Sequence, residues 1–274
     1  WYAMLGQLGA PIGFMLASAL FLFLHSQLSG EDFLGWGWRY PFFVAFAINV
    51  VALFARLRLV VTEEYTQAME ERELEPIGIF EMLRKQDYNI FLGAFAALAS
   101  YALFHLVTVF PLSWITQGST QTVNQVLLIQ VIGAGVGILG TIASGLVADR
   151  IGRRTTLGTL AALIGIFSFF APWLLGGSRA AQDAFILIGF ALLGLSYGQS
   201  AGTVTSNFPI RFRYTGAALT TDVAWLIGAA FAPLVALGLS ANFGLGYVSV
   251  YLLSGALCTL AALRVNRALE EVRD

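Results

Sequence analysis

The chain has 274 residues, of which 58% are hydrophobic and only 11% are charged, and its mean hydropathy is +0.76. A soluble domain carries about 25% charged residues, so this composition excludes a water-soluble globule. The net charge of −1 offers no basic surface for nucleic acid. The single cysteine, Cys258, excludes both an internal disulfide framework and a cysteine-based zinc site. The composition indicates an all-α, polytopic helix bundle in a lipid bilayer.

Eight apolar stretches are long enough to cross a membrane, since a helix needs about 20 apolar residues to span the hydrocarbon core. Six of the seven connections between them are short. The remaining connection, 62–87, holds eight acidic and three basic residues. The expected spans are approximately 2–27, 41–61, 88–115, 123–147, 155–175, 183–205, 215–239 and 247–265.

The acidic connection divides the chain into 1–61, with two expected spans, and 88–274, with six spans and a short tail. Thr62 is a suitable helix N-cap and is followed by two acids that suit the positive end of the helix dipole. Pro76 is expected to break such a helix into two pieces. A broken helical linker and a solvated tether therefore remain two interpretations of 62–87.

The basic residues orient the spans. Cytoplasmic loops of membrane proteins carry an excess of Lys and Arg. If alternate connections face opposite sides, 13 of the 15 basic residues fall on one side, and only Arg39 and Arg179 fall on the other. We therefore expect 62–87 and both ends of this chain to be cytoplasmic.

Two expected spans contain glycines spaced four residues apart, which places them on one helix face. Gly133 and Gly137 lie in the fourth span, and Gly194, Gly198 and Gly202 lie in the sixth. Small residues at this spacing let helices approach closely within a membrane. The same region formally matches a dinucleotide-binding fingerprint, but that motif needs a preceding strand and a helix that opens into water. We interpret these glycines as helix-packing positions.

A patterned string of glycines, one acid and arginines occupies the connection between the fourth and fifth spans. A positively charged membrane anchor would explain the arginines, but not the acid or the regular glycines. The string resembles the signature loop of the major facilitator superfamily, which has twelve spans in two halves and carries this loop after the second helix of each half. Its residues are Gly145, Asp149, Arg150, Gly152, Arg153 and Arg154.

The resemblance implies an alignment with the family. If 62–87 is the family's central loop, the eight spans are the family's fifth to twelfth helices, and we expect four helices to precede Trp1. Three local strings resemble the metabolite:proton symporter branch: Gln7 to Phe14, Trp36 to Phe42, and a second cytoplasmic motif containing Pro209, Arg211, Arg213 and Gly216. Ser206 departs from that branch, which usually has Glu at this place, so any salt bridge made by that Glu is absent here.

The resemblance also implies a function. Members of this branch carry small polar metabolites, such as organic acids, proline and betaine, together with a proton, by rocker-switch alternating access in the plasma or inner membrane. It implies no cofactor beyond the coupling proton, and we expect a monomer. Asp149 is expected near the N-terminus of the first span, whose dipole is positive there. Asp149 and the arginines of the signature would then form a breakable cytoplasmic latch between the halves.

Ionisable residues inside spans usually mark substrate or ion pathways. Asp222 lies about two turns into the seventh span, and Trp225 follows on much the same face. A lone Asp in the bilayer needs a partner or a water-filled cavity. Asp222 either carries a proton or is a structural partner of an arginine.

Several further polar residues are expected at similar depth. His105 is suited to proton coupling because histidine titrates near neutral pH, and a hydrogen-bonded core histidine is the alternative. We expect these residues to line a central cavity together with Asp222 and Trp225. They are Tyr101, His105, Gln130, Tyr197 and Gln199.

The substrate itself is left open by the sequence. An organic anion would need a cationic anchor, and no Lys or Arg of this chain lies near the middle of a span. The anchor therefore lies outside this chain, or the substrate is zwitterionic or neutral. Two other classes of protein are alternatives: a non-transporting sensor or scaffold, and a membrane enzyme, which would need a cluster of catalytic groups that these spans do not offer. His25 and His105 are too far apart in sequence to suggest a metal site.

Overall fold

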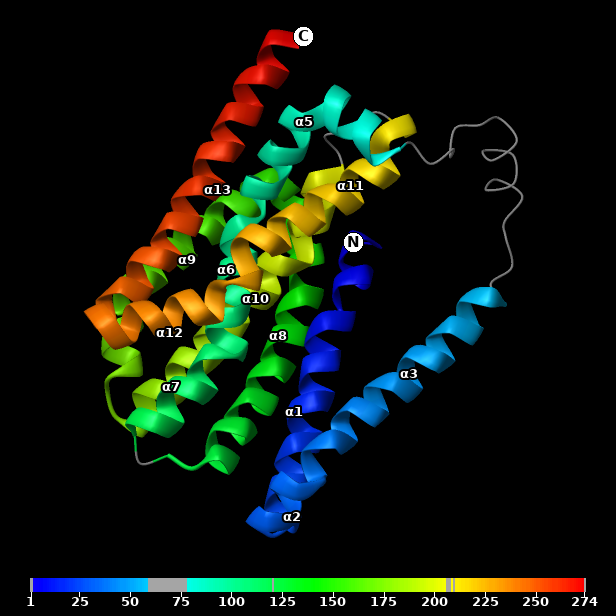
Figure 1. Cartoon of the computed structure of the whole chain (residues 1–274). Coiled ribbons are helices and arrows are strands. Elements are labelled where there is room, and N and C mark those ends of the chain that lie inside the picture. Colours follow the sequence, from blue (N-terminus) through cyan, green and yellow to red (C-terminus); the bar gives the residue numbers. More distant parts are fainter. Residues whose placement is uncertain (1, 59–77, 120, 206–207, 209, 274) are drawn as a thin grey trace.

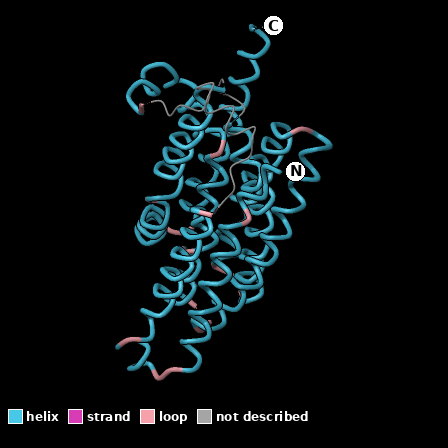
Figure 2. Tube along the Cα trace, turned by 90° about the vertical axis from the view of Figure 1, so that its right-hand side faces the viewer, coloured by secondary structure: helices cyan, strands magenta, loops and turns pink. Residues whose placement is uncertain are grey.

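The computed structural model describes residues 2–58, 78–119, 121–205, 208 and 210–273. These residues form helices almost throughout, and most helices run along the long axis of one bundle (Figures 1 and 2). In chain order they are η1 Tyr2–Gln7, α1 Gly9–Gln27, α2 Gly30–Gly35, η2 Gly37–Arg39, α3 Tyr40–Leu57, α5 Ile79–Ala96, α6 Leu98–Thr108, α7 Phe110–Gly118, α8 Val123–Ile151, α9 Arg153–Leu175, α10 Arg179–Thr205, α11 Ile210–Trp225, the π-helical turn η3 Leu226–Ala230, α12 Ala232–Phe243 and α13 Gly246–Arg273.

Eight helical stretches of the described residues are long and apolar enough to cross a membrane, which confirms the number expected from the sequence. The structure therefore establishes an all-α, polytopic membrane bundle. The stretches are Met4–Gln27, Gly37–Leu57, Leu98–Gly118, Val123–Ile151, Arg153–Leu175, Arg179–Ala201, Tyr214–Phe243 and Gly246–Val265.

The third and seventh spans are composite rather than continuous. The third consists of α6 and α7, preceded by α5, which already begins at Ile79 within the stretch assigned to the linker. The seventh consists of α11, the π-helical turn η3 and α12. Residues 59–77, including Pro76, lie outside the described part of the chain, so the two interpretations of the linker are not distinguished.

Local sequence explains the boundaries of the fourth span. Thr122 caps the start of α8: its hydroxyl accepts the backbone N–H of Gln125, whose side chain accepts the backbone N–H of Thr122. This reciprocal capping box satisfies two of the donors that a helix start leaves unpaired. The helix ends at Gly152, whose φ of 83° is a left-handed conformation that favours glycine. The chain can therefore turn from α8 directly into α9.

Helices α8 and α10 pack against each other through small residues. A Cβ atom placed on Gly194 would overlap the backbone carbonyl oxygen of Gly137, and one placed on Gly133 would lie 2.6 Å from the ring of Phe190. Gly198 also faces α8 directly. The two backbones therefore approach more closely than any larger residues would permit.

Helix α1 lies alongside α8, and η1 before it contacts both α8 and α10. At the other end of α1, His25 Nδ1 and Asn124 Oδ1 are hydrogen bonded at 2.7 Å. Helix α3 instead diverges from the bundle in Figure 1, and its main contacts are with α1 and η2. Its large apolar side chains are exposed, including Phe42 and Phe46. The core therefore lies among α5 to α13, where α6 is almost wholly buried.

Candidate functional site

Five aromatic side chains from three helices meet beside α6. Tyr101, Phe104 and His105 come from α6, Tyr197 from α10 and Trp225 from α11. The ring centroid of Trp225 lies 4.9 Å from Tyr101, 5.2 Å from Phe104, 6.0 Å from His105 and 6.5 Å from Tyr197. Tyr101 and Phe104 lie 5.9 and 5.7 Å from Tyr197. We call these five residues the aromatic cluster.

Helix geometry explains this convergence. Tyr101, Phe104 and His105 are spaced three and four residues apart, so they share one face of α6. Trp225 is the last residue of α11 before the π-helical turn, and Gly228 in that turn brings α11 close to α6. A Cβ on Gly228 would lie 2.8 Å from Leu98 Cδ1 and 3.0 Å from Tyr101 Cβ. The small residue thus sets the distance between Trp225 and the face of α6.

One side of the aromatic cluster is buried and the other is partly open. Tyr101 and Tyr197 are only 2% and 7% exposed, whereas Phe104, His105 and Trp225 are partly accessible. The Tyr101 hydroxyl lies near the Ser200 and Thr221 side chains. His105 Nδ1 is buried without a hydrogen-bond partner among the described residues. The cluster therefore combines ring faces with polar atoms, as expected of a site for a small polar molecule.

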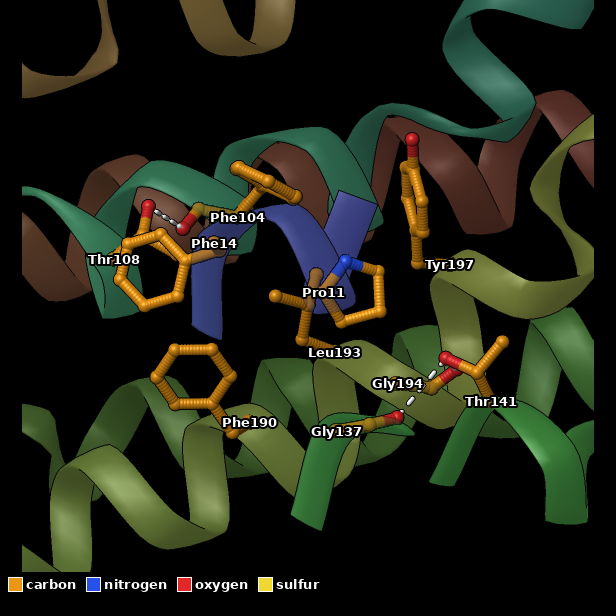
Figure 3. Close-up of a pocket in the computed structure, with 10 residues that line it drawn as sticks. All are labelled: Pro11, Phe14, Phe104, Thr108, Gly137, Thr141, Phe190, Leu193, Gly194 and Tyr197. Carbon is orange, nitrogen blue, oxygen red and sulfur yellow. Dashed lines mark hydrogen bonds between the residues drawn. The ribbon is translucent and has the colours of Figure 1, made fainter. Parts of the chain in front are cut away.

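A narrow crevice adjoins the cluster and shares two of its residues, Phe104 and Tyr197 (Figure 3). Across it Phe14 of α1 packs against Phe190 of α10, with ring centroids 5.5 Å apart. The space inside is about 10 Å³, barely the room that one water molecule needs. The structure therefore shows a closed arrangement here. The lining residues are Pro11, Phe14, Phe104, Thr108, Gly137, Thr141, Phe190, Leu193, Gly194 and Tyr197.

Four of the seven residues expected along the pathway meet in the cluster: Tyr101, His105, Tyr197 and Trp225. Asp222 does not join them, because its side chain is exposed on α11. The expectation of a buried carboxylate is therefore not met within the described part of the chain. The neighbouring inward positions of α11 are taken by Thr220 and Ala224.

The two glutamines expected in the cavity wall instead join helices to each other. Gln130 of α8 donates to the carbonyl oxygen of Thr108 at 2.6 Å, and Gln199 of α10 donates to Ser144 Oγ at 3.0 Å. Both glutamines are buried. A buried amide group without a hydrogen bond is costly in a membrane bundle. Hydrogen bonds from a glutamine side chain to a neighbouring helix are therefore favoured.

Gln130 is positioned to support the break between α6 and α7. Pro111 has no N–H, which interrupts the helix there, and Gln130 satisfies the carbonyl of Thr108 beside the break. We expect Gln130→Leu to leave that carbonyl without this donor and to destabilise the protein by about 1–3 kcal/mol. Thermal unfolding of the purified protein measures the effect, and Gln125→Leu, at the helix start, is expected to cost less. Equal midpoints for Gln130→Leu and the unmodified protein would contradict this role.

Sequence reasoning missed Phe104. The available signal was its position three residues after Tyr101 and next to His105, which puts it on the same face of α6. Phenylalanine is common in any apolar span, so its residue type alone carried no functional information. Only its ring contacts with Tyr197 and Trp225 identify it as part of the cluster.

The signature residues surround the turn between α8 and α9. Gly145 is buried in α8, while Asp149, Arg150, Gly152 and Arg153 are exposed. The remaining residue of the string, Arg154, donates through Nη2 to the carbonyl oxygen of Leu263 in α13. This guanidinium therefore holds α9 to α13 within one bundle, a contact that the latch interpretation did not include.

The second cytoplasmic motif is described only in part. Pro209 and Ser206 lie outside the described residues, and the side chains of Arg211 and Arg213 are not described. The surroundings of the packing position Gly202, in α10, are likewise not described. Gly216 is buried on α11, where a Cβ would lie 2.6 Å from Met82 Cε and 2.8 Å from the ring of Phe208. This glycine therefore permits close packing between α11 and α5.

Fold and site together define an integral membrane helix bundle with an aromatic, partly polar site between its helices. Residues 1–225 match the model of the Major Facilitator Superfamily, and the chain belongs to that family. Its family match and its helical bundle thus define the class of membrane protein to which the chain belongs.

The chain is similar to several transport proteins of bacteria. It is 35% identical to the inner membrane metabolite transport protein YhjE of Escherichia coli strain K12, over 96% of this chain and 61% of the relative. It is 27% identical to the shikimate transporter of the same strain, over 92% and 59%. It is 24% identical to the proline/betaine transporter of Salmonella typhimurium strain LT2, over 80% and 46%. The chain thus spans about three fifths of the first two relatives and under half of the third.

Proposed function

We propose that the protein is a secondary active transporter that moves a small polar metabolite together with a proton by rocker-switch alternating access. Its family and its similarity to proteins named for transport of metabolites, shikimate and proline or betaine support this proposal. The observation that carries it is the aromatic cluster, because it joins α6, α10 and α11 at a place where polar atoms accompany ring faces.

The cluster favours a zwitterion over a simple anion within this chain. Aromatic faces attract cations at ring distances of about 6 Å, most strongly for Trp and Tyr. No Lys or Arg of the chain lies near the middle of a span, so its residues provide no cationic anchor for a carboxylate there. We propose that Trp225, Tyr101 and Phe104 contact the substrate's cationic part. An organic acid would need an anchor from residues beyond this chain.

Two residues are the proposed proton carriers. His105 has a buried nitrogen without a hydrogen-bond partner among the described residues, and it contacts Trp225 in the cluster. Asp222 is exposed on α11, three residues before Trp225. Because a proton that binds at either group changes the charge beside the cluster, it would alter affinity for a charged substrate.

The proposal also covers the membrane in which the protein acts, its orientation there and its oligomeric state. The distribution of Lys and Arg favours cytoplasmic ends for this chain, and the similarity to an inner membrane protein favours the inner membrane. We propose that the protein acts as a monomer with no cofactor other than the proton. The acidic linker would then join a bundle that includes 1–61 to the bundle formed by 88–274.

Uptake into proteoliposomes that contain the full-length protein tests the proposal. The panel consists of radiolabelled organic acids, proline and betaine, each offered with and without an inward proton gradient. We expect accumulation of a zwitterion that collapses when the gradient is dissipated. Uptake that only equilibrates would contradict proton coupling. No uptake by folded protein would contradict transport of these substrates and would favour the sensor or scaffold alternative.

Asp149 provides a test of alternating access. It lies at the end of α8, and η1, which precedes α1, packs against α8 and α10. If Asp149 interacts with the positive N-terminus of the first span in one state of the transport cycle, Asp149→Ala should slow transport several-fold without lowering the amount of protein in the membrane. Asp183→Ala, at the start of α10, is the matched control and should leave the rate unchanged. Equal rates for both variants at equal surface levels would contradict the latch.

A further inference from the structure

Two helix breaks bracket the aromatic cluster, and each is held by a hydroxyl group of α13. One break lies between α5 and α6, a few residues before Tyr101. The other is the π-helical turn η3, which begins directly after Trp225. π-Helical turns are frequent at functional sites. Their geometry decides where the rings of α6 and α11 lie.

Thr259 holds the first break. In a continuous α-helix the N–H of Ala99 would donate to the carbonyl of Phe95, four residues earlier. Instead Thr259 Oγ1 accepts the N–H of Ala99 at 3.0 Å and donates to the carbonyl oxygen of Phe95 at 3.0 Å. The hydroxyl is thus inserted into the helical hydrogen-bond ladder, a recognised cause of helix kinks. It thus pairs with two backbone groups that would bond to each other in a continuous helix.

Tyr251 holds the second break. Its hydroxyl donates to the carbonyl oxygen of Gly228 in η3 at 3.1 Å. In a π-helix the donor for that carbonyl would come from the residue five positions on, which is Pro233, and proline has no N–H. Tyr251 therefore supplies the donor that the local sequence lacks.

Both hydroxyls belong to one face of α13. Tyr251, Gly255 and Thr259 are spaced four residues apart, so they lie in a row about 12 Å long. Gly255, in the middle, lies against α6: a Cβ there would be 3.3 Å from Ala102 Cβ and 3.8 Å from the carbonyl oxygen of Leu98. This row runs along α6 and reaches both breaks.

We propose that Thr259 and Tyr251 are positioning residues of the substrate site, which set the relative placement of Tyr101, Phe104 and Trp225 by holding the two breaks. Among the described residues, both hydroxyls pair with backbone groups of α5, α6 and η3 and not with a ring of the aromatic cluster, so their effect passes through the backbone. The inference rests on the proposed function insofar as the cluster binds substrate.

The fluorescence of Trp225 tests the positioning directly. The full-length protein is prepared with Trp225 as its only tryptophan, and Thr259→Val and Tyr251→Phe are introduced singly. Each variant removes a hydroxyl with little change of shape. We expect the emission of Trp225 to move to longer wavelength and its quenching by acrylamide to increase in both variants. Thr259→Ser keeps the hydroxyl and should restore the original spectrum.

Ser254→Ala is the matched control, because Ser254 lies on the same helix, is exposed and donates only to the carbonyl of Tyr251 in its own helix. It should leave Trp225 unchanged. Uptake of radiolabelled betaine provides the second measurement. We expect KM to rise about five-fold in Thr259→Val and in Tyr251→Phe with little change in the maximal rate, which corresponds to about 1 kcal/mol.

The outcomes separate this proposal from the proposed function. Unchanged Trp225 spectra in both variants would overturn the positioning role, as would a lower unfolding temperature with unaltered spectra in the folded fraction. A purely structural hydroxyl would give that second result. Altered spectra in a protein that takes up no betaine would support the positioning role and contradict betaine as the substrate.

Discussion

Gly194→Ala is expected to disrupt the contact between α8 and α10 and to lower transport by more than tenfold. The added Cβ would overlap the backbone carbonyl oxygen of Gly137, and a backbone atom has no rotamer by which to move away. The two helices must therefore separate. Overpacking of this kind costs about 1–3 kcal/mol, so the apparent unfolding midpoint should fall by about 5 °C. Thermal unfolding in detergent and uptake in proteoliposomes measure the two effects.

Gly135→Ala is the matched control for this prediction. Gly135 lies in α8, in the same apolar region, but apart from its adjacent residues and the helix's own backbone no atom of the described residues lies within 4 Å of where its Cβ would be. Alanine also favours a helix over glycine by about 1 kcal/mol. Gly135→Ala should therefore be as stable as the unmodified protein or more so. If both alanine variants behave alike, the close approach of α8 and α10 is not what these glycines provide.

Trp225→Ala is expected to reduce uptake at least tenfold, with a smaller loss for Trp225→Phe. The indole contacts all four other rings of the aromatic cluster, at centroid distances of 4.9 to 6.5 Å. Each aromatic pair contributes about 0.5–1.5 kcal/mol beyond its buried area, and a tenfold effect corresponds to about 1.4 kcal/mol. Removing the ring therefore opens the cluster and takes away a face for a cationic group. Phenylalanine keeps a smaller face.

Trp173→Ala controls for the loss of a tryptophan from a membrane span. Trp173 is 72% exposed on α9, and its ring contacts only Phe170 among the described residues. Uptake should be unchanged in this variant. Full uptake in Trp225→Ala, measured at equal amounts of reconstituted protein, would show that the aromatic cluster is not the substrate site.

The candidate site was partly accessible to sequence reasoning. Tyr101, His105, Tyr197 and Trp225 attract notice because polar or amphipathic residues are rare deep in apolar spans. The same reasoning placed Gln130 and Gln199 in the cavity wall, although both bind neighbouring helices. A polar group in a span must find a partner, but the sequence does not show whether that partner is a substrate or a backbone carbonyl. Helix rotation decides this, and it also leaves Asp222 on an exposed face.

The number of spans was predictable because the bilayer imposes a length of about 20 apolar residues on every crossing helix. The signature between Gly145 and Arg154 similarly identified the family, since its residues form one continuous string. A membrane helix forms its backbone hydrogen bonds within its own segment, so these bonds require no information from elsewhere in the chain. These properties are local, and one sequence is enough to establish them.

What the sequence alone determined is therefore the class of protein: an all-α membrane bundle of eight spans that belongs to the Major Facilitator Superfamily. Only the tertiary structure decided where the spans are interrupted and which side chains meet. The break before Tyr101 depends on Thr259, 160 residues from Ala99 along the chain. No local pattern reveals such a partner, because hydrogen bonds across helices depend on how each helix is rotated and packed in three dimensions.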